Sequence, residues 1–257
     1  MNPPAEPLAP PPPALQIDDL SVSYRTGPFK PARRVVHGLG LSVSPGEVVG
    51  FLGPNGAGKS TTIKAILGFL TPDTGSVRVF GHEAGSTAAK AKIGYLPEVA
   101  LYYPFLTPME TLRLYGRLQG MGGRELERAS RDLLERVGLG GRERQQLRTF
   151  SKGMQQRLGV AQALLGSPDL LVLDEVSSGI DPLGRRDLRE VLREAKDRGA
   201  TIFFSSHELD EVAQLCDRVV LVSGGRVVDA RRMDAGLRAG IGSALETYFV
   251  DTLHTAR

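Results

Sequence analysis

The 257-residue sequence contains Gly53-Pro54-Asn55-Gly56-Ala57-Gly58-Lys59-Ser60-Thr61, and this stretch limits which fold classes the chain can adopt. It has a glycine, four further residues and then Gly-Lys-Ser, the pattern of a phosphate-binding loop. Glycines let successive backbone N–H groups point inward at phosphate oxygens, because no Cβ obstructs them. Lys59 would reach the outer phosphates, and Ser60 would place a hydroxyl on Mg²⁺. A glycine-rich turn that only joins two elements would not explain Lys-Ser at this spacing, so the stretch predicts nucleotide binding.

The residues around this loop predict a strand before it and a helix after it. Residues 47–52 form a short apolar run, and residues 59–69 are expected to form a helix whose N-terminal dipole favours bound anions. Residues 170–173 form a second apolar run, which ends in Asp174 and Glu175. Ligands of open α/β sheets gather at the carboxyl ends of such strands. There Asp174 could hold Mg²⁺ through its waters, and Glu175 could polarise a water for attack on the γ-phosphate. A surface turn after a core strand is the alternative, and the upstream phosphate loop argues against it.

The composition is that of an ordinary soluble chain, with 41% hydrophobic and 24% charged residues. The net charge of +3 is weak support for nucleic acid or anionic lipid as a partner, and a solvated surface is the preferred explanation. The single cysteine, Cys216, excludes an internal disulfide framework. No apolar run approaches the ~18–20 residues that cross a bilayer, so we expect any membrane-spanning part to belong to another protein.

The order of the predicted elements suggests one α/β domain with a helical insertion. Residues 1–13, rich in proline and alanine, are expected to form a disordered tail and carry no secretory signal. Strands and helices alternate on both sides of a middle region that has helical periodicity, which implies a mostly parallel sheet covered by helices. We expect the ordered domain to span 14–230, with a helical subdomain at about 98–159. Residues 231–257 are expected to be a C-terminal tail without chemical signal.

A third motif connects these features to a known family. Phe150-Ser151-Lys152-Gly153-Met154-Gln155-Gln156-Arg157 resembles the family signature Leu-Ser-Gly-Gly-Gln followed by Gln-Arg or a similar basic pair. With it, the chain resembles the nucleotide-binding subunit of an ATP-binding cassette (ABC) transporter, from Tyr24 to the predicted hairpin near Val228, and its motif variants are most similar to the exporter branch. The resemblance implies a RecA-like P-loop NTPase core with an N-terminal antiparallel β portion and the inserted α-helical subdomain.

The resemblance also implies roles for residues outside the phosphate loop. Ser151 and Gly153 would contact the ATP held by a second copy of the chain, which implies an ATP-sandwiched homodimer. Tyr24 would stack on adenine, although a half-buried strand tyrosine is a serious alternative. The loop ending at Asp181, Ser178-Gly179-Ile180-Asp181, is similar to the family loop that links the two ATP sites. His207, after the apolar strand predicted at 201–205, matches the switch histidine that contacts the γ-phosphate.

The sequence departs from the family pattern at three places. Glu98 stands where the family commonly has a glutamine that senses Mg²⁺, the attacking water and the membrane partner, so Glu98 joins Ser60 and Asp174 as a candidate metal ligand. Lys152 and Met154 replace a glycine and the glutamine of the signature. Residues 176–177 are Val-Ser where Pro-Thr is usual. None of these changes removes a group that the chemistry requires.

The resulting hypothesis is an ATP-hydrolysing subunit, with ATP and Mg²⁺ as cofactors, that energises transport by a separate multi-spanning permease. We expect it to be cytoplasmic and peripheral on the inner face of the cell membrane, with no nucleic-acid partner. A cassette ATPase acting on nucleic acid is the alternative, but such relatives typically have two cassettes, a long coiled coil or metal-binding cysteines. A nucleotide-binding switch without turnover is a third class, and Glu175 and His207 argue against it. The cargo and the direction of transport cannot be read from the sequence.

A loop at 98–109 is expected to dock on the permease, because it has many large apolar side chains where chains normally meet solvent. The alternative is that these side chains complete the core of the helical subdomain. The residues concerned are Leu101, Tyr102, Tyr103, Phe105 and Leu106.

Overall fold

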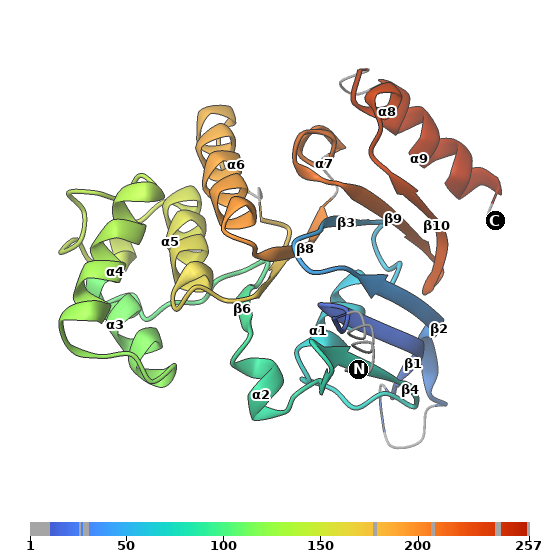
Figure 1. Cartoon of the computed structure of the whole chain (residues 1–257), viewed down its shortest axis with the longest axis horizontal. Coiled ribbons are helices and arrows are strands. Elements are labelled where there is room, and N and C mark those ends of the chain that lie inside the picture. Colours follow the sequence, from blue (N-terminus) through green and yellow to red (C-terminus); the bar gives the residue numbers. More distant parts are fainter. Residues whose placement is uncertain are drawn as a thin grey trace, which may run out of the picture.

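The computed structural model describes residues 11–25, 27, 31–176, 179–206, 209–239 and 243–255. An antiparallel sheet at the N-terminal side has the strand order β2-β1-β4-β5 (Figure 1). Its strands are β1 (Leu15–Tyr24), β2 (Arg33–Val43), β4 (Thr74–Val79) and β5 (His82–Glu83). Strand β1 is irregular, with register shifts against both neighbours and a positive φ of 47° at Asp19.

A six-stranded sheet with the order β10-β9-β3-β8-β7-β6 forms the centre of the molecule. Its strands are β3 (Val48–Leu52), β6 (Ile93–Leu96), β7 (Leu170–Asp174), β8 (Thr201–Ser206), β9 (Arg218–Ser223) and β10 (Arg226–Arg232). All neighbours are parallel except the hairpin β9–β10. The order places the ends of β3, β7 and β8 side by side. This arrangement confirms the predicted α/β class with its mostly parallel sheet and N-terminal antiparallel portion.

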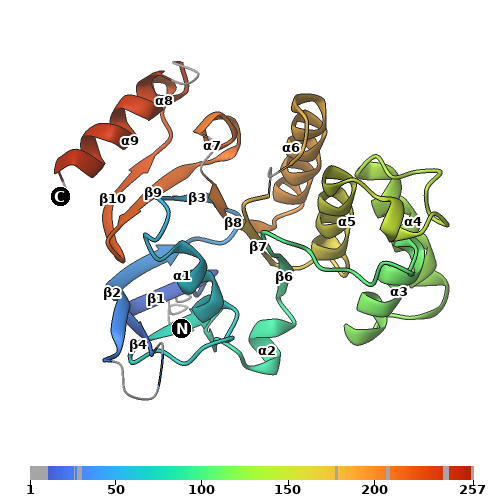
Figure 2. The same ribbon diagram turned by 180° about the vertical axis from the view of Figure 1, so that it is seen from behind.

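The helices divide between the sheets and a separate helical region (Figures 1 and 2). Their bounds are α1 (Lys59–Ile66), α2 (Thr87–Lys90), α3 (Pro108–Leu118), α4 (Gly123–Arg136), the 3-10 helix η1 (Leu147–Thr149), α5 (Lys152–Leu164), α6 (Pro182–Asp197), α7 (Leu209–Leu215), α8 (Ala235–Ala239) and α9 (Ser243–Thr255). Helices α3, α4 and α5 lie together at the side of the sheet that β6 borders, and they form the inserted helical subdomain. Helix α1 ends three residues before the expected Phe69, and Gly68 then has a left-handed φ of 70°.

The two faces of the parallel sheet belong to different hydrophobic cores. In β3, Val49 and Phe51 pack with the antiparallel sheet and α1. Their neighbours Val48 and Leu52 belong to the core shared with α5, α6 and α7. Because side chains alternate along a strand, a fully apolar strand buries both faces. The phosphate loop therefore leaves a strand that is fixed from two sides.

Residues 233–255, for which the sequence carried no chemical signal, include helices α8 and α9. Leu245 of α9 is fully buried, and the hydroxyl of Tyr248 donates to Asp229 Oδ2 at 2.7 Å. The guanidinium of Arg231 lies 4.5 Å from the centre of the Tyr248 ring. These contacts fix α9 against β10. Within the described part of the chain, no helix is long and apolar enough to span a bilayer.

Candidate functional site

The phosphate loop connects the buried end of β3 to the first turn of α1. A Cβ at Gly53 would collide with the carbonyl oxygen of Val222, so only glycine fits there. Gly58, the N-cap of α1, has a φ of 100°, which side chains other than glycine rarely tolerate. Residues 53–61 thus line one space together with the N-terminus of α1, and a helix N-terminus there favours a bound phosphate group.

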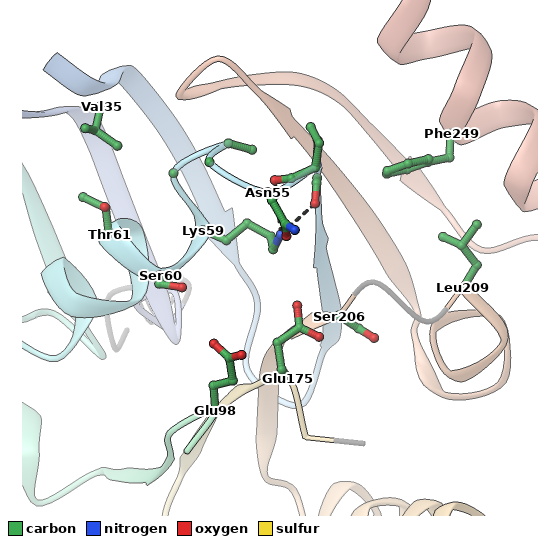
Figure 3. A pocket seen from close by; sticks show the side chains of 15 residues that line it. Val35, Asn55, Lys59, Ser60, Thr61, Glu98, Glu175, Ser206, Leu209 and Phe249 are labelled. Carbon is green, nitrogen blue, oxygen red and sulfur yellow. Dashed lines mark hydrogen bonds between the residues drawn. The ribbon is translucent and has the colours of Figure 1, made fainter. Parts of the chain in front are cut away.

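Lys59 is buried at the base of this loop, with 9% of its surface exposed. Its Nζ donates to the carbonyl oxygens of Gly53 at 2.7 Å and Pro54 at 3.4 Å (Figure 3). Two neutral acceptors offset only part of the cost of burying an ammonium group. The side chain is therefore well placed to bind an anion above the loop.

A pocket of about 580 Å³ opens above the loop and joins segments that are distant in sequence. It is lined by Val35, Gly53, Pro54, Asn55, Gly56, Ala57, Gly58, Lys59, Ser60, Thr61, Glu98, Glu175, Ser206, Leu209 and Phe249. Figure 3 shows the carboxylates of Glu98 and Glu175 below Lys59, between Ser60 and Ser206, and Leu209 and Phe249 at the far end from Val35 and Thr61. The structure thus unites the predicted loop with two predicted acidic residues.

Ser205 at the end of β8 organises the two carboxylates that follow β7. Its hydroxyl donates to Asp174 Oδ1 at 2.5 Å and accepts the backbone N–H of Glu175 at 3.1 Å. Glu175 has a φ of 52°, a left-handed conformation that is unusual for a glutamate. Such local strain is typical of functional sites, and here the residue that has it faces the pocket.

The pKa of Tyr95, on β6, depends on its burial and on the charge of Asp174 at the end of β7. Burial, and secondly the negative charge of Asp174, raise the pKa of Tyr95 to about 12. Asp174 itself is only 6% exposed, behind the pocket lining.

The proposed metal ligands offer only oxygen donors. Ser60 has a hydroxyl, while Glu98 and Asp174 have carboxylates, and hard cations such as Mg²⁺ prefer these ligands. Ser60 and Glu98 line the pocket, and Asp174 lies at the adjacent strand end. The residues present therefore fit Mg²⁺, although their role as its ligands stays a prediction.

The signature residues lie outside this pocket, at the start of α5. Ser151 is the N-cap and accepts the N–H of Met154 at 3.2 Å. Gly153 lies against the loop before α6, since a Cβ there would be 3.1 Å from the carbonyl oxygen of Gly179. Asp181 caps α6 and accepts the N–H of Gly184 at 2.8 Å. The three predicted residues thus lie at neighbouring helix starts.

Tyr24 and His207 were also predicted to contact the nucleotide. The hydroxyl of Tyr24 is 3.5 Å from Thr61 Oγ1, at the Val35 end of the pocket, but Tyr24 does not itself line the pocket. Its stacking on adenine stays a prediction. His207 and Ser178 lie outside the described residues.

The sequence reasoning missed several residues of the site. Ser205 and Ser206 had a recognisable signal, because they are polar residues at the carboxyl end of an apolar strand. Gln156 is 2% exposed, and its amide donates to the carbonyl of Val176 at 3.1 Å. Leu209 and Phe249 had no local signal, because only the packing of α7 and α9 brings them to the pocket.

Comparisons with known proteins agree with this geometry. The profile of the family described as ABC transporter matches residues 36–178. An uncharacterized ABC transporter ATP-binding protein of Synechocystis sp. is 42% identical over 82% of this chain and 60% of its own length. The daunorubicin/doxorubicin resistance ATP-binding protein of Streptomyces peucetius is 39% identical over 82% of this chain and 64% of its length.

A solved ATP-binding subunit of an ABC transporter is similar in structure over almost the whole chain. It has a TM-score of 0.83 and 34% identity, covering 93% of this chain and 99% of its own. The matched region spans less than two thirds of the two curated relatives above.

We expect Ser205→Ala to destabilise the site locally. The change removes a donor to Asp174 and an acceptor for Glu175, which should lower the free energy of unfolding by about 1–3 kcal/mol. Urea unfolding measures this loss. The control is Ser42→Ala, at an exposed strand serine whose carbonyl, rather than its hydroxyl, accepts from Arg218. Equal effects of the two changes would contradict the organising role of Ser205.

Proposed function

The chain belongs to the ABC transporter family, and from this we propose that it binds and hydrolyses ATP to energise transport by a separate membrane permease. One observation carries the proposal: the phosphate loop and Glu175 line the same pocket. A loop alone would support binding, but a carboxylate beside it supports hydrolysis.

In this proposal the loop binds the phosphates of ATP through its backbone N–H groups. The ammonium of Lys59 exchanges its contacts with Gly53 and Pro54 for contacts with the outer phosphates. The N-terminal dipole of α1 acts in the same direction. Tyr24 would then hold the adenine at the Thr61 end of the pocket, where its hydroxyl lies.

Glu175 is the proposed general base. It would accept a hydrogen bond from the attacking water and hold that water in line with the γ-phosphate. Ser205 bonds the backbone N–H of Glu175 and one oxygen of Asp174, so it holds the Asp174 carboxylate and the backbone that carries Glu175. Mg²⁺, when bound, would neutralise charge on the phosphates, and Ser60, Asp174 and Glu98 are its proposed ligands. His207 is proposed to contact the γ-phosphate.

The position of the signature supports a site shared between two copies. Ser151 and Gly153 do not line the pocket of their own chain. A second copy, related by a two-fold axis, could place its own α5 start over this pocket and receive the same in return. We therefore propose an ATP-bound homodimer.

Some side chains of the 98–109 loop pack inside the helical subdomain, and others are exposed and available to a partner. Tyr102 faces inward, and its hydroxyl donates to Gln162 Oε1 at 3.1 Å. Leu101, Tyr103 and Phe105 are exposed by 87%, 60% and 63%, with the two rings 5.6 Å apart. These three side chains form the proposed docking surface for the permease. The relative named for daunorubicin/doxorubicin resistance favours export and gives no support to a nucleic-acid role.

Glu175→Gln tests the central proposal. The amide keeps the shape of the side chain but cannot act as a base, so hydrolysis should slow by a factor on the order of 10²–10⁴. ATP affinity should persist, and the ATP-bound dimer should accumulate. Turnover assays and sedimentation with Mg-ATP measure both effects. Unchanged turnover would refute the assignment of Glu175, and a wild-type chain without ATPase activity would refute the function.

Tyr103→Ala combined with Phe105→Ala tests the docking surface. Because both rings are exposed, we expect an almost unchanged free energy of unfolding, an unchanged affinity for ATP and weaker co-purification with a co-expressed permease. Val250→Ala, at an exposed position of α9, serves as the control. If the double variant unfolds, these rings belong to the core of the helical subdomain instead.

Glu98→Gln tests whether Glu98 faces the nucleotide, because the change should alter how ATP affinity depends on Mg²⁺. With Mg²⁺ saturating, affinity should change little, within the ~0.5–1.5 kcal/mol of one hydrogen bond. With Mg²⁺ depleted, the wild type should lose more affinity than the variant, because its carboxylate then repels the triphosphate. ATP titrations of both proteins across a Mg²⁺ series make the comparison. Parallel curves would show that Glu98 does not face the nucleotide.

A further inference from the structure

Leu183 is a large apolar residue at an unexpected place. It is the second residue of α6, directly after Pro182, and 67% of its surface is exposed. It belongs to neither hydrophobic core of the described chain. The adjacent cap, Asp181, lies beside the start of α5, because Gly153 approaches the Gly179 carbonyl. Leu183 is therefore exposed next to the segment that the proposed dimer places over the partner's pocket.

The pocket has a matching apolar surface at one end. Leu209 and Phe249 line it beyond Ser206, on the side away from Val35 (Figure 3). Neither side chain can donate a hydrogen bond to phosphate. Phe249 is also fixed in place, because its neighbour Tyr248 is bonded to Asp229. The two residues therefore form a preformed apolar wall at the end of the pocket opposite Val35 and Thr61, which is the phosphate end of the pocket.

The short chain between Glu175 and α6 limits which end of the pocket Leu183 can reach. Few residues separate Glu175, which lines the pocket, from Asp181, which caps α6. A short connection keeps the start of α6 close to the phosphate end of its own pocket. The start of α6 also lies beside the start of α5, so a pair that places α5 over the partner's pocket brings the start of α6 to the same pocket, and by symmetry this contact occurs twice. Val35 lies at the opposite end and is not within this reach.

We propose that, in the ATP-bound pair, Leu183 of each copy packs against Phe249 and Leu209 of the partner subunit. The inference rests on the proposed function, since it requires the nucleotide-dependent pair. It makes α9 part of the dimer interface and gives the pair an apolar contact beside its charged sites. Burial of the exposed Leu183 and the half-buried Phe249 then favours association.

Cross-linking between introduced cysteines tests this contact. Leu183→Cys and Phe249→Cys are combined in a Glu175→Gln background and treated with a short bis-maleimide. The single native cysteine, Cys216, is fully buried and so gives little background. We expect a covalent dimer with Mg-ATP and none without nucleotide.

The matched control replaces Phe249→Cys by Val250→Cys. Val250 is the next residue of α9 and points about 100° away around the helix, with 41% of its surface exposed. This pair should cross-link at least tenfold less. A dimer by sedimentation with no cross-link, or equal cross-linking of the two pairs, would overturn the inference alone. Absence of any ATP-dependent dimer would refute the proposed homodimer and the inference together.

An independent measurement avoids the cross-linker. In the Glu175→Gln background, Leu183→Ala and Phe249→Ala should each raise the dimer dissociation constant, on the order of tenfold because each change occurs twice in the pair. The double change should raise it by less than the product of the two single effects. Fully multiplicative effects would show that the two residues do not touch. ATP binding by the Leu183→Ala monomer should be unchanged, because Leu183 does not line the pocket of its own chain.

Discussion

The buried ammonium of Lys59 is the interaction on which the site depends. A charge that is 9% exposed and bonded to two backbone carbonyls is only partly compensated. The chain tolerates it because β3 is fixed on both faces and the loop after it has little freedom. In the proposed function a phosphate group would supply the missing compensation. Part of the affinity for nucleotide would then come from relieving the cost of burying this ammonium group.

The same architecture explains why the acidic residues converge on the loop. Strands β3, β8 and β7 are parallel neighbours, so their carboxyl ends meet at one edge. The loop follows one of them, Ser205 and Ser206 end the second, and Asp174 ends the third. The order of the strands alone therefore brings side chains from three distant segments of the sequence together. The left-handed φ of Glu175 then turns that residue into the pocket.

Much of the fold and part of the site could be predicted because their signals are local. The phosphate loop, the apolar strand before Asp174 and the signature around Ser151 each lie within about ten residues, and helices α3, α4 and α5 lie in the middle region for which helical periodicity was predicted. Tyr102 and Tyr103 could not be separated, because their directions depend on α5. Phe249 could not be predicted at all, since its place depends on how α9 packs against β10. The contacts of Tyr24, Ser151 and His207 with nucleotide stay predictions.

The structure shows the surroundings of two residues, Glu98 and Lys152, that depart from the family pattern. Glu98 lines the pocket and so adds a charge where the family commonly has an amide. The aliphatic part of Lys152 lies against Gly179, where a Cβ would collide with it. The replacement of a signature glycine is thus accommodated by a glycine in the loop before α6.

The hydrogen bond from Gln156 to the carbonyl of Val176 has a consequence for the proposed pair. It ties α5, which begins at the signature, to the residue directly after Glu175 of the same chain. In the proposed pair α5 would complete the partner's site, so a rearrangement around one γ-phosphate would reach the other site through this bond. Such coupling would be reciprocal, and binding at either site would change affinity at the other by the same factor.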